Sequence, residues 1–332
     1  MRAVRIAQET GPDGALELVD APPPPATSWL GGEPVTVAVQ AAGVSFPELL
    51  QTRGLYQIKP PLPFIPGSEV AGVVQSASPA SGFQPGDRVA AFCGLGGFAD
   101  VAVAPAHLTF PLPGALDFAQ GAGLVLNYHT AYFALALRGR LRAGEKVLVH
   151  GAAGGVGTAA LQVARGLGAS TIALVSSERK REVALQAGAE HALLLGESWR
   201  EEVRELAGGG VDVVLDPVGG DRFTDSLRCL REEGRLVVVG FTGGSIPEVK
   251  VNRLLLNNVE VVGAGWGGYA LGKPALCGEI GDALQRMILD GTVAPIVGAS
   301  YPLDQAAQAL KLLEQRGALG KIVLALDAPA GL

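Results

Sequence analysis

A glycine-rich turn in the middle of the chain has the residue types and spacing of an anion-binding loop. It reads Gly151-Ala-Ala-Gly-Gly-Val-Gly157, follows the apolar run 146–149 and precedes a helical pattern over 158–167. Glycines permit the tight turn and the close approach of phosphate groups to the backbone, and the free N–H groups at a helix start attract an anion. The order of strand, turn and helix therefore predicts a pyrophosphate site, with a tight turn that binds nothing as the alternative.

The tip of the next predicted strand indicates which nucleotide is bound. After the run 171–175 the chain reads Ser-Ser-Glu-Arg-Lys-Arg over 176–181. Folds that prefer NAD usually carry an acid at this tip for the ribose hydroxyl, whereas a 2′-phosphate requires donors and positive charge. We therefore predict NADPH, held by Ser176, Ser177 and Lys180.

Three alternatives remain open at this tip. Arg179 or Arg181 could replace Lys180 as the direct contact, and Glu178 could turn inward and favour NAD. The segment could also be only a solvated first helical turn.

Composition restricts the class of partner. The chain has 332 residues, 48% hydrophobic and 17% charged, with a net charge of -6. This length suffices for two domains, and the absence of a basic block argues against nucleic acid or an anionic membrane as a partner. No apolar run reaches roughly eighteen residues and the N-terminus lacks a signal-peptide core. We expect a cytoplasmic protein with a small-molecule partner.

Cysteine and histidine spacing does not predict a metal site. The three cysteines, Cys93, Cys229 and Cys277, are far apart and odd in number, so we expect reduced and mostly buried thiols. The four histidines follow no ligand spacing, and ordinary structural roles are expected for them: His107, His129, His150 and His191.

The pattern of predicted strands and helices changes near residue 118. The earlier part consists of short strands separated by Pro and Gly, such as 34–40, 69–74 and 87–92, which predicts an irregular β unit. The later part alternates apolar runs with helical stretches and predicts a parallel sheet with helices on both faces. The predicted strands there are 146–149, 171–175, 211–215, 234–239 and 259–262. A last strand, 321–326, is expected to return to the N-terminal unit.

With these residues placed, the chain resembles the medium-chain dehydrogenase/reductase superfamily, in its zinc-free quinone oxidoreductase branch, which includes zeta-crystallin. The shared motifs are Ala41-Ala-Gly-Val-Ser45, Arg53-Gly-Leu-Tyr56, Pro66-Gly-Ser-Glu69, Pro85-Gly-Asp-Arg-Val89, Asn127-Tyr-His-Thr-Ala-Tyr132, the glycine turn, Asp216-Pro-Val-Gly-Gly220 and Gly320-Lys-Ile-Val-Leu324. Their order and spacing cover nearly the whole chain.

The resemblance implies an α/β fold of two domains. Residues 1–122 and 266–332 would form a GroES-like, β-rich catalytic domain. Residues 123–265 would form a doubly wound Rossmann domain that binds NADP.

The resemblance also implies a cofactor site. Asn127 and Thr130 would lie near the nicotinamide end, and Phe241 and Thr242 on a loop that covers the cofactor. Lys321 would approach the cofactor from the returning C-terminal segment, with a structural role as the alternative. The pyrophosphate would be held by Gly154, Gly155 and Val156.

Departures from the zinc enzymes of the superfamily determine the expected chemistry. Those enzymes place Cys and His where this chain has Ser45 and Ser68, and the four-cysteine lobe is absent. Without such ligands no metal is expected. Hydride transfer then requires an electron-poor acceptor, such as a quinone or an alkene conjugated to a carbonyl.

Three residues are expected to line the acceptor pocket: Ser45, Tyr56 and Trp266. Tyr56 is either a proton donor or an aromatic wall, and Trp266 either a pocket wall or a packed residue. Some members of the branch carry Asn at the position of Ser45 and Tyr at that of Leu50, and these two differences leave the identity of the acceptor open. Some also carry Tyr near the adenosine at the position of Leu195, and this difference slightly weakens the inference of NADPH.

We therefore predict a zinc-independent NADPH:quinone oxidoreductase. The alternatives are an enoyl, enone or enal reductase, acyl-CoA esters included, and an NADPH-binding protein with little turnover. We further expect a homodimer formed through the edge strand near 259–262, because a bare apolar edge needs cover.

Overall fold

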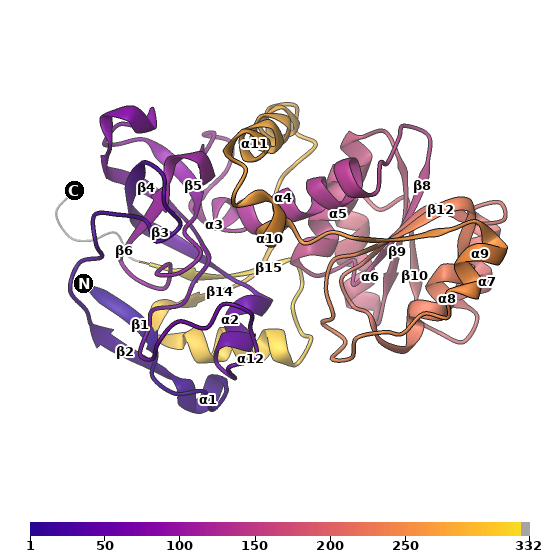
Figure 1. The fold of residues 1–332 in the computed structure, drawn as a ribbon, viewed down its shortest axis with the longest axis horizontal. Helices are drawn as coiled ribbons and strands as arrows, with labels where there is room; N and C mark the ends of the chain where they lie inside the picture. The colour runs from indigo at the N-terminus through magenta and orange to yellow at the C-terminus, as the bar shows by residue number, and fades with distance from the viewer. Residues whose placement is uncertain (327–332) are drawn as a thin grey trace. The chain divides into compact units, whose positions relative to one another are not determined.

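The computed structural model describes residues 1–326, which form two compact units. Of the described residues, the first unit comprises 1–126, 273–281 and 295–326, and the second comprises 127–272 and 282–294. The helices and strands of each unit are labelled in Figure 1.

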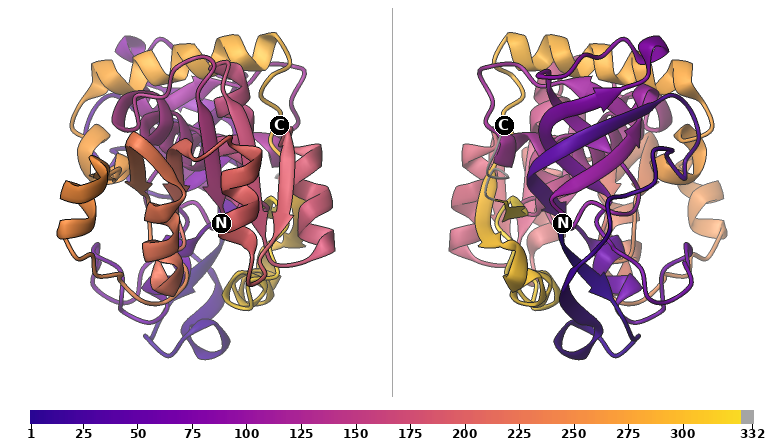
Figure 2. Two further views of the ribbon diagram at one scale, coloured as in Figure 1. Left: turned by 90° about the vertical axis from the view of Figure 1, so that its right-hand side faces the viewer. Right: turned by 90° about the vertical axis from the view of Figure 1, so that its left-hand side faces the viewer.

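The first unit is built on a mostly antiparallel sheet of order β14-β15-β3-β4-β5-β7, with β6 paired to β3. Strands β1 and β2 form a separate hairpin. The strands are β1 Arg2–Ile6, β2 Leu16–Asp20, β3 Pro34–Val44, β4 Glu69–Ala77, β5 Arg88–Phe92, β6 Val101–Pro105, β7 Thr109–Pro111, β14 Val297–Pro302 and β15 Lys321–Ala325. β15 pairs antiparallel with β3, as predicted for the returning strand, and the sheet strands are seen in the right-hand view of Figure 2.

Short helices complete the first unit. The helices within the first 120 residues were not predicted, because the sequence pattern there indicated only strands. The α-helices are α1 Pro12–Ala15, α2 Phe46–Gln51, α3 Phe118–Gly121 and α12 Ala306–Glu314, and the 3-10 turns are η1 Pro79–Ser81, η2 Ala106–Leu108 and η5 Leu303–Gln305. Leu303, Ala306, Ala309 and Leu310 pack into the core that the valines of β3 and β4 line. The helix α12 therefore covers part of the sheet.

The second unit contains a six-stranded parallel sheet of order β10-β9-β8-β11-β12-β13. Its strands are β8 Lys146–His150, β9 Ser170–Val175, β10 His191–Leu194, β11 Val211–Asp216, β12 Leu230–Val238 and β13 Glu260–Gly263. The central strand β11 is buried over its whole length, as expected for a strand covered on both faces. This sheet confirms the predicted doubly wound α/β fold.

Helices flank both faces of this sheet (Figure 2, left). The helices are α5 Gly155–Gly166, α6 Glu178–Gln186, α7 Trp199–Leu206, α8 Phe223–Arg228, α9 Asn252–Asn257 and α10 Trp266–Ala270, with η4 Gly220–Arg222 and the π-helical turn η3 Phe133–Arg138. α4 Val125–Tyr132 and α11 Pro274–Leu289 each have residues in both units. Trp199, Val203, Phe223 and Leu227 of α7 and α8 pack on Leu148, Ile172 and Leu236 of the sheet.

The two units differ from the predicted domains in three segments, because residues 123–126 group with the first unit and residues 266–272 and 282–294 with the second. Trp266 packs edge-on against His129, and the side-chain amide of Gln162 on α5 donates to the carbonyl of Ala294 at 2.9 Å. The backbone N–H of Ala294 donates to the same Gln162 side chain. These contacts attach both segments to the second unit. Residues 327–332 of the predicted catalytic domain lie outside the described residues.

All three cysteines are buried thiols, as predicted. Burial raises the pKa of each thiol, to about 11 for Cys277. No helix within residues 1–326 has the length and apolar character needed to span a membrane.

Candidate functional site

The glycine turn closes between β8 and α5 as the spacing predicts. Gly151 has a positive φ of 58°, and the N–H of Gly154 donates to its carbonyl at 3.0 Å. A Cβ at Gly157 would overlap the backbone of Gly151 and Ala152, so only glycine permits this approach of helix and turn. Gly154 is the N-cap of α5 and makes no side-chain cap, which leaves N–H groups at the helix start for an anion.

Asn127 lies against this turn. A Cβ at Gly155 would collide with the side-chain amide of Asn127, which is 5% exposed. Thr130 follows three residues later on α4, so both side chains lie on one helix face. The structure thus places Asn127 beside the glycine turn, with Thr130 about one turn further along α4.

The tip of β9 presents two hydroxyls and an ammonium. The Lys180 Nζ donates to the Ser176 Oγ at 3.1 Å, and Ser177 caps α6 by accepting the N–H of Lys180. Ser176 and Ser177 are exposed. Glu178 faces Arg181 at 3.5 Å in an exposed ion pair, which favours the outward orientation of this carboxylate.

Two loops at the carboxyl ends of β11 and β12 pack on each other. The Thr242 hydroxyl donates to the carbonyl of Pro217 at 3.0 Å, and the N–H of Gly243 donates to that of Val218 at 2.8 Å. Phe241 is 38% exposed on the second loop. Ligands of open α/β sheets bind at the carboxyl ends of the strands, so the predicted loop residues lie at the expected edge.

A buried ionic cluster in the first unit holds Ser45 and Lys321. The Lys321 ammonium is ion-paired with Oε1 of Glu69 and donates to Ser45 Oγ at 2.6 Å. Oε2 of Glu69 accepts the N–H of Leu126 at 2.8 Å. Lys321 is 4% exposed and Glu69 is fully buried. This ion pair favours the structural alternative for Lys321, because its charge is directed at Glu69 and Ser45.

Glu48 is the second carboxylate of this cluster. It accepts the N–H of Ser45 at 2.9 Å, the N–H of Ser68 at 2.8 Å and the Ser68 hydroxyl. Burial raises the pKa of Glu48, while the hydrogen bond from Ser68 and the charge of Lys321 act in the opposite direction. The two serines at the usual ligand positions of the zinc enzymes are thus both tied to Glu48.

The other two predicted pocket residues differ in exposure. Tyr56 is half-buried in the loop after α2, and burial, with a smaller effect of the Glu48 charge, raises the pKa of its phenol. Trp266 is 2% exposed and packs edge-on against His129, with ring centroids 5.5 Å apart, which favours the packed alternative for this tryptophan.

The histidines with described contacts are buried in structural positions. Burial lowers the pKa of His129 to about 3, and that of His150 to about 4, where the Ser226 hydroxyl lies 2.8 Å from the His150 ring. Among residues 1–326, no group of three or more His, Cys, Asp or Glu side chains is arranged to hold a metal ion.

Sequence reasoning missed Glu48 and Glu69 as members of the site. A signal for Glu48 was available, because Ser45-x-x-Glu48 has the spacing of a capping box and the structure forms one. No local pattern pointed to a partner for Glu69, since Lys321 is 252 residues away in the sequence.

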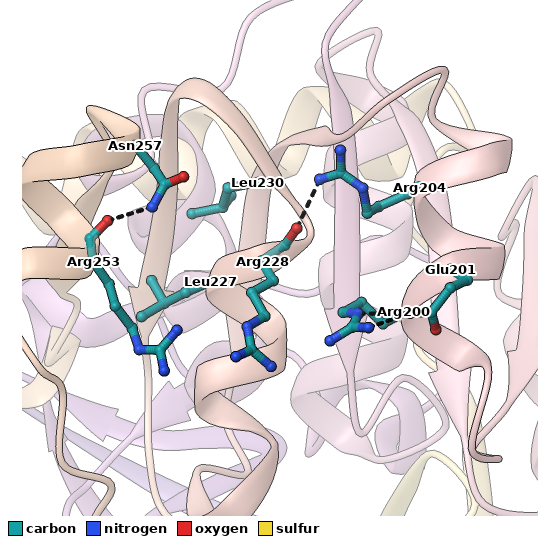
Figure 3. Close-up of a pocket in the computed structure, with 8 residues that line it drawn as sticks. All are labelled: Arg200, Glu201, Arg204, Leu227, Arg228, Leu230, Arg253 and Asn257. Atoms are coloured by element: carbon teal, nitrogen blue, oxygen red, sulfur yellow. Dashed lines mark hydrogen bonds and ion pairs between the residues drawn. The ribbon is translucent and has the colours of Figure 1, made fainter.

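An arginine-lined pocket of about 560 Å³ is formed in the second unit by side chains of α7, α8 and α9 and by Leu230 at the amino end of β12 (Figure 3). Arg200 pairs with Glu201 and Asp225, and Arg204 donates to the carbonyl of Arg228. Nucleotides bind at the opposite edge of such a sheet. The pocket is therefore separate from the predicted cofactor site.

Comparisons with known proteins agree with these observations. Residues 31–114 match the alcohol dehydrogenase GroES-like domain family, and residues 155–276 match the zinc-binding dehydrogenase family. The quinone oxidoreductase of Rattus norvegicus is 36% identical over 331 residues, or 98% of each chain.

Solved structures show the same similarity. The quinone oxidoreductase of Thermus thermophilus, described with its NADPH complex, is 36% identical with a TM-score of 0.84, over 98% of this chain and 100% of that one. The Escherichia coli quinone oxidoreductase complexed with NADPH is 30% identical with a TM-score of 0.86 over the same shares. The chain belongs to the quinone oxidoreductase branch of the medium-chain dehydrogenase/reductase superfamily.

Proposed function

We propose that this protein is a zinc-independent oxidoreductase that transfers hydride from NADPH to a quinone. The observation that carries the cofactor assignment is the tip of β9, where the Lys180 ammonium and the Ser176 hydroxyl converge. Two relatives with solved NADPH complexes support it. A cytoplasmic location stays a prediction of the sequence.

In the proposed mechanism the protein binds and orients two reactants. NADPH supplies the hydride when bound. The N-terminus of α5 with Gly154, Gly155 and Val156 would hold the pyrophosphate, and Ser176, Ser177 and Lys180 the 2′-phosphate. Asn127 and Thr130 would contact the nicotinamide end, and the Phe241–Thr242 loop would exclude water. Ser45 and Tyr56 would contact the acceptor.

A panel of electron acceptors tests the activity. We expect NADPH oxidation with 1,4-benzoquinone and related quinones to be faster than with enones, enals or enoyl-CoA esters. Faster turnover of the alkenes would make the protein an alkene reductase. Tight NADPH binding without turnover of any acceptor would support the alternative of an NADPH-binding protein with little turnover.

Metal independence follows from Ser45 and Ser68, whose side chains are engaged by Lys321 and Glu48. A hydroxyl in such a network is a poor ligand for zinc, which prefers thiolate and imidazole. We expect purified protein to contain far less than one zinc per chain and to keep its activity in EDTA. Stoichiometric zinc together with loss of activity on chelation would contradict this.

Tyr56→Phe distinguishes a pocket wall from a proton donor. Because burial and the Glu48 charge raise the pKa of the phenol, we expect it to act as a wall. The variant should then keep kcat for a quinone within about threefold, whereas removal of a general acid would lower kcat roughly a hundredfold. Tyr56→Ala should raise the acceptor KM, and unchanged kinetics in this variant would place the acceptor elsewhere.

We further propose a homodimer formed through the edge of the parallel sheet. β13 is one of the two edge strands, and Leu255 and Leu256 on the preceding α9 are each 76% exposed. Exposed apolar side chains beside an open strand edge favour association of two copies. We expect light scattering to report a dimer at micromolar concentration and Leu255→Glu/Leu256→Glu to be monomeric. A monomeric unmodified protein would refute this interface.

A further inference from the structure

The Ser45 hydroxyl receives a hydrogen bond from a group that can only donate. An ammonium carries three N–H donors and no acceptor, so Ser45 Oγ must accept from Lys321 Nζ at 2.6 Å. The capping box directs the Glu48 N–H toward the same oxygen. The hydroxyl hydrogen therefore points away from both groups. Within residues 1–326 it forms no hydrogen bond with a protein acceptor.

The surroundings hold the Lys321 ammonium in place. Glu69 neutralises it, and the side-chain stem passes Gly123, where a Cβ would lie 3.0 Å from the Lys321 Cγ. Lys321 is 4% exposed, so water screens its charge only weakly. A hydroxyl that accepts from a buried ammonium is polarised and becomes a stronger donor to a third partner.

The rest of the cluster does not compete for this hydroxyl hydrogen. The Glu48 oxygens face the two backbone N–H groups and the Ser68 hydroxyl, and Oε2 of Glu69 faces the N–H of Leu126. Cys93 donates to backbone carbonyls. Each carboxylate thus has partners of its own, and neither accepts the Ser45 hydroxyl hydrogen.

We propose that Ser45 is a catalytic hydrogen-bond donor to the carbonyl oxygen of the acceptor, and that Lys321 is the positioning residue that polarises it. This inference rests on the proposed function. Hydride transfer to a quinone or an enone places negative charge on that oxygen, and a preorganised donor with a buried positive charge behind it stabilises this charge. Lys321 keeps its proton, and the proton that completes the reduced product comes from solvent.

The test compares variants of the full chain with 1,4-benzoquinone as acceptor. Ser45→Ala should lower kcat/KM by about ten- to a hundredfold, the effect of losing a hydrogen bond to a charged group, with the Kd for NADPH within about twofold of the unmodified protein. Ser45→Thr keeps the hydroxyl and should restore most of the activity. Ser78→Ala, which removes a serine cap from η1 in the same unit, is the matched control and should leave kcat/KM unchanged.

A double variant separates positioning from folding. Lys321→Met/Glu69→Gln removes both charges of the ion pair and should lower kcat/KM about as much as Ser45→Ala. Adding Ser45→Ala to it should cause little further loss, because both changes act on one hydrogen bond. A merely structural lysine would instead give independent, additive losses.

The outcomes also separate this inference from the proposed function. Three results would each overturn the proposed roles of Ser45 and Lys321 while the quinone activity stands. They are an unchanged kcat/KM in Ser45→Ala, an unchanged kcat/KM in Lys321→Met/Glu69→Gln, and strictly additive losses in the triple variant. Absence of NADPH oxidation by the unmodified protein with every quinone and enone would refute the proposed function and this inference together.

Discussion

Lys180→Ala should weaken NADPH binding by about ten- to a hundredfold and leave NADH binding nearly unchanged. The Lys180 ammonium and the Ser176 hydroxyl lie 3.1 Å apart at the tip of β9. Loss of a charge-assisted hydrogen bond to a phosphate costs about 1.5 to 3 kcal/mol, which corresponds to this range of affinity. Fluorescence titration of both nucleotides measures the two dissociation constants.

Arg179→Ala is the matched control, because it removes an exposed positive charge one residue earlier. It should change the NADPH affinity by less than about threefold, since screened surface charges act weakly. Equal losses of NADPH and NADH affinity in Lys180→Ala would show that this residue does not recognise the 2′-phosphate. A large effect of Arg179→Ala alone would transfer that role to Arg179.

Lys321→Met should strongly destabilise the first unit. The change leaves the fully buried Glu69 without its counter-charge. Breaking a buried ion pair by removing one partner costs about 3–5 kcal/mol. At roughly 2–4 °C per kcal/mol for domains of 150–250 residues, the melting temperature should fall by about 6–20 °C. Differential scanning calorimetry measures the change.

Lys321→Met/Glu69→Gln should recover most of this stability, because replacing both members of a buried pair is often close to neutral. The glutamine oxygen can still accept the N–H of Leu126. The exposed pair of Arg140 and Glu260 offers the control, and Arg140→Met should shift the melting temperature by less than about 4 °C. A small effect of Lys321→Met on the melting temperature would mean that Glu69 does not depend on Lys321 as its buried counter-charge.

The sequence by itself determined five of the six strands of the nucleotide-binding unit, and β10 His191–Leu194 was not predicted. The turn Gly151–Gly157 lies between β8 and α5 as predicted. The ends of the five predicted strands lie within two residues of the observed ends, except at the start of β12, which begins four residues earlier than predicted. These elements are local: periodic apolar runs and glycines specify a strand, a turn and a helix within about thirty residues. The polar tip at 176–181 belongs to the same local unit, so its hydroxyls and ammonium were also predicted.

Only the tertiary structure decided which residues surround Ser45. Glu48 is three residues away and within reach of sequence analysis, but Glu69 and Lys321 come from β4 and β15. The antiparallel pairing of β15 with β3 and of β3 with β4 brings them together. Such long-range pairings leave no periodic trace in the sequence. The partner of a buried charge is therefore known only once the strand order is known, because burial and distance, not residue type, decide which charges must pair.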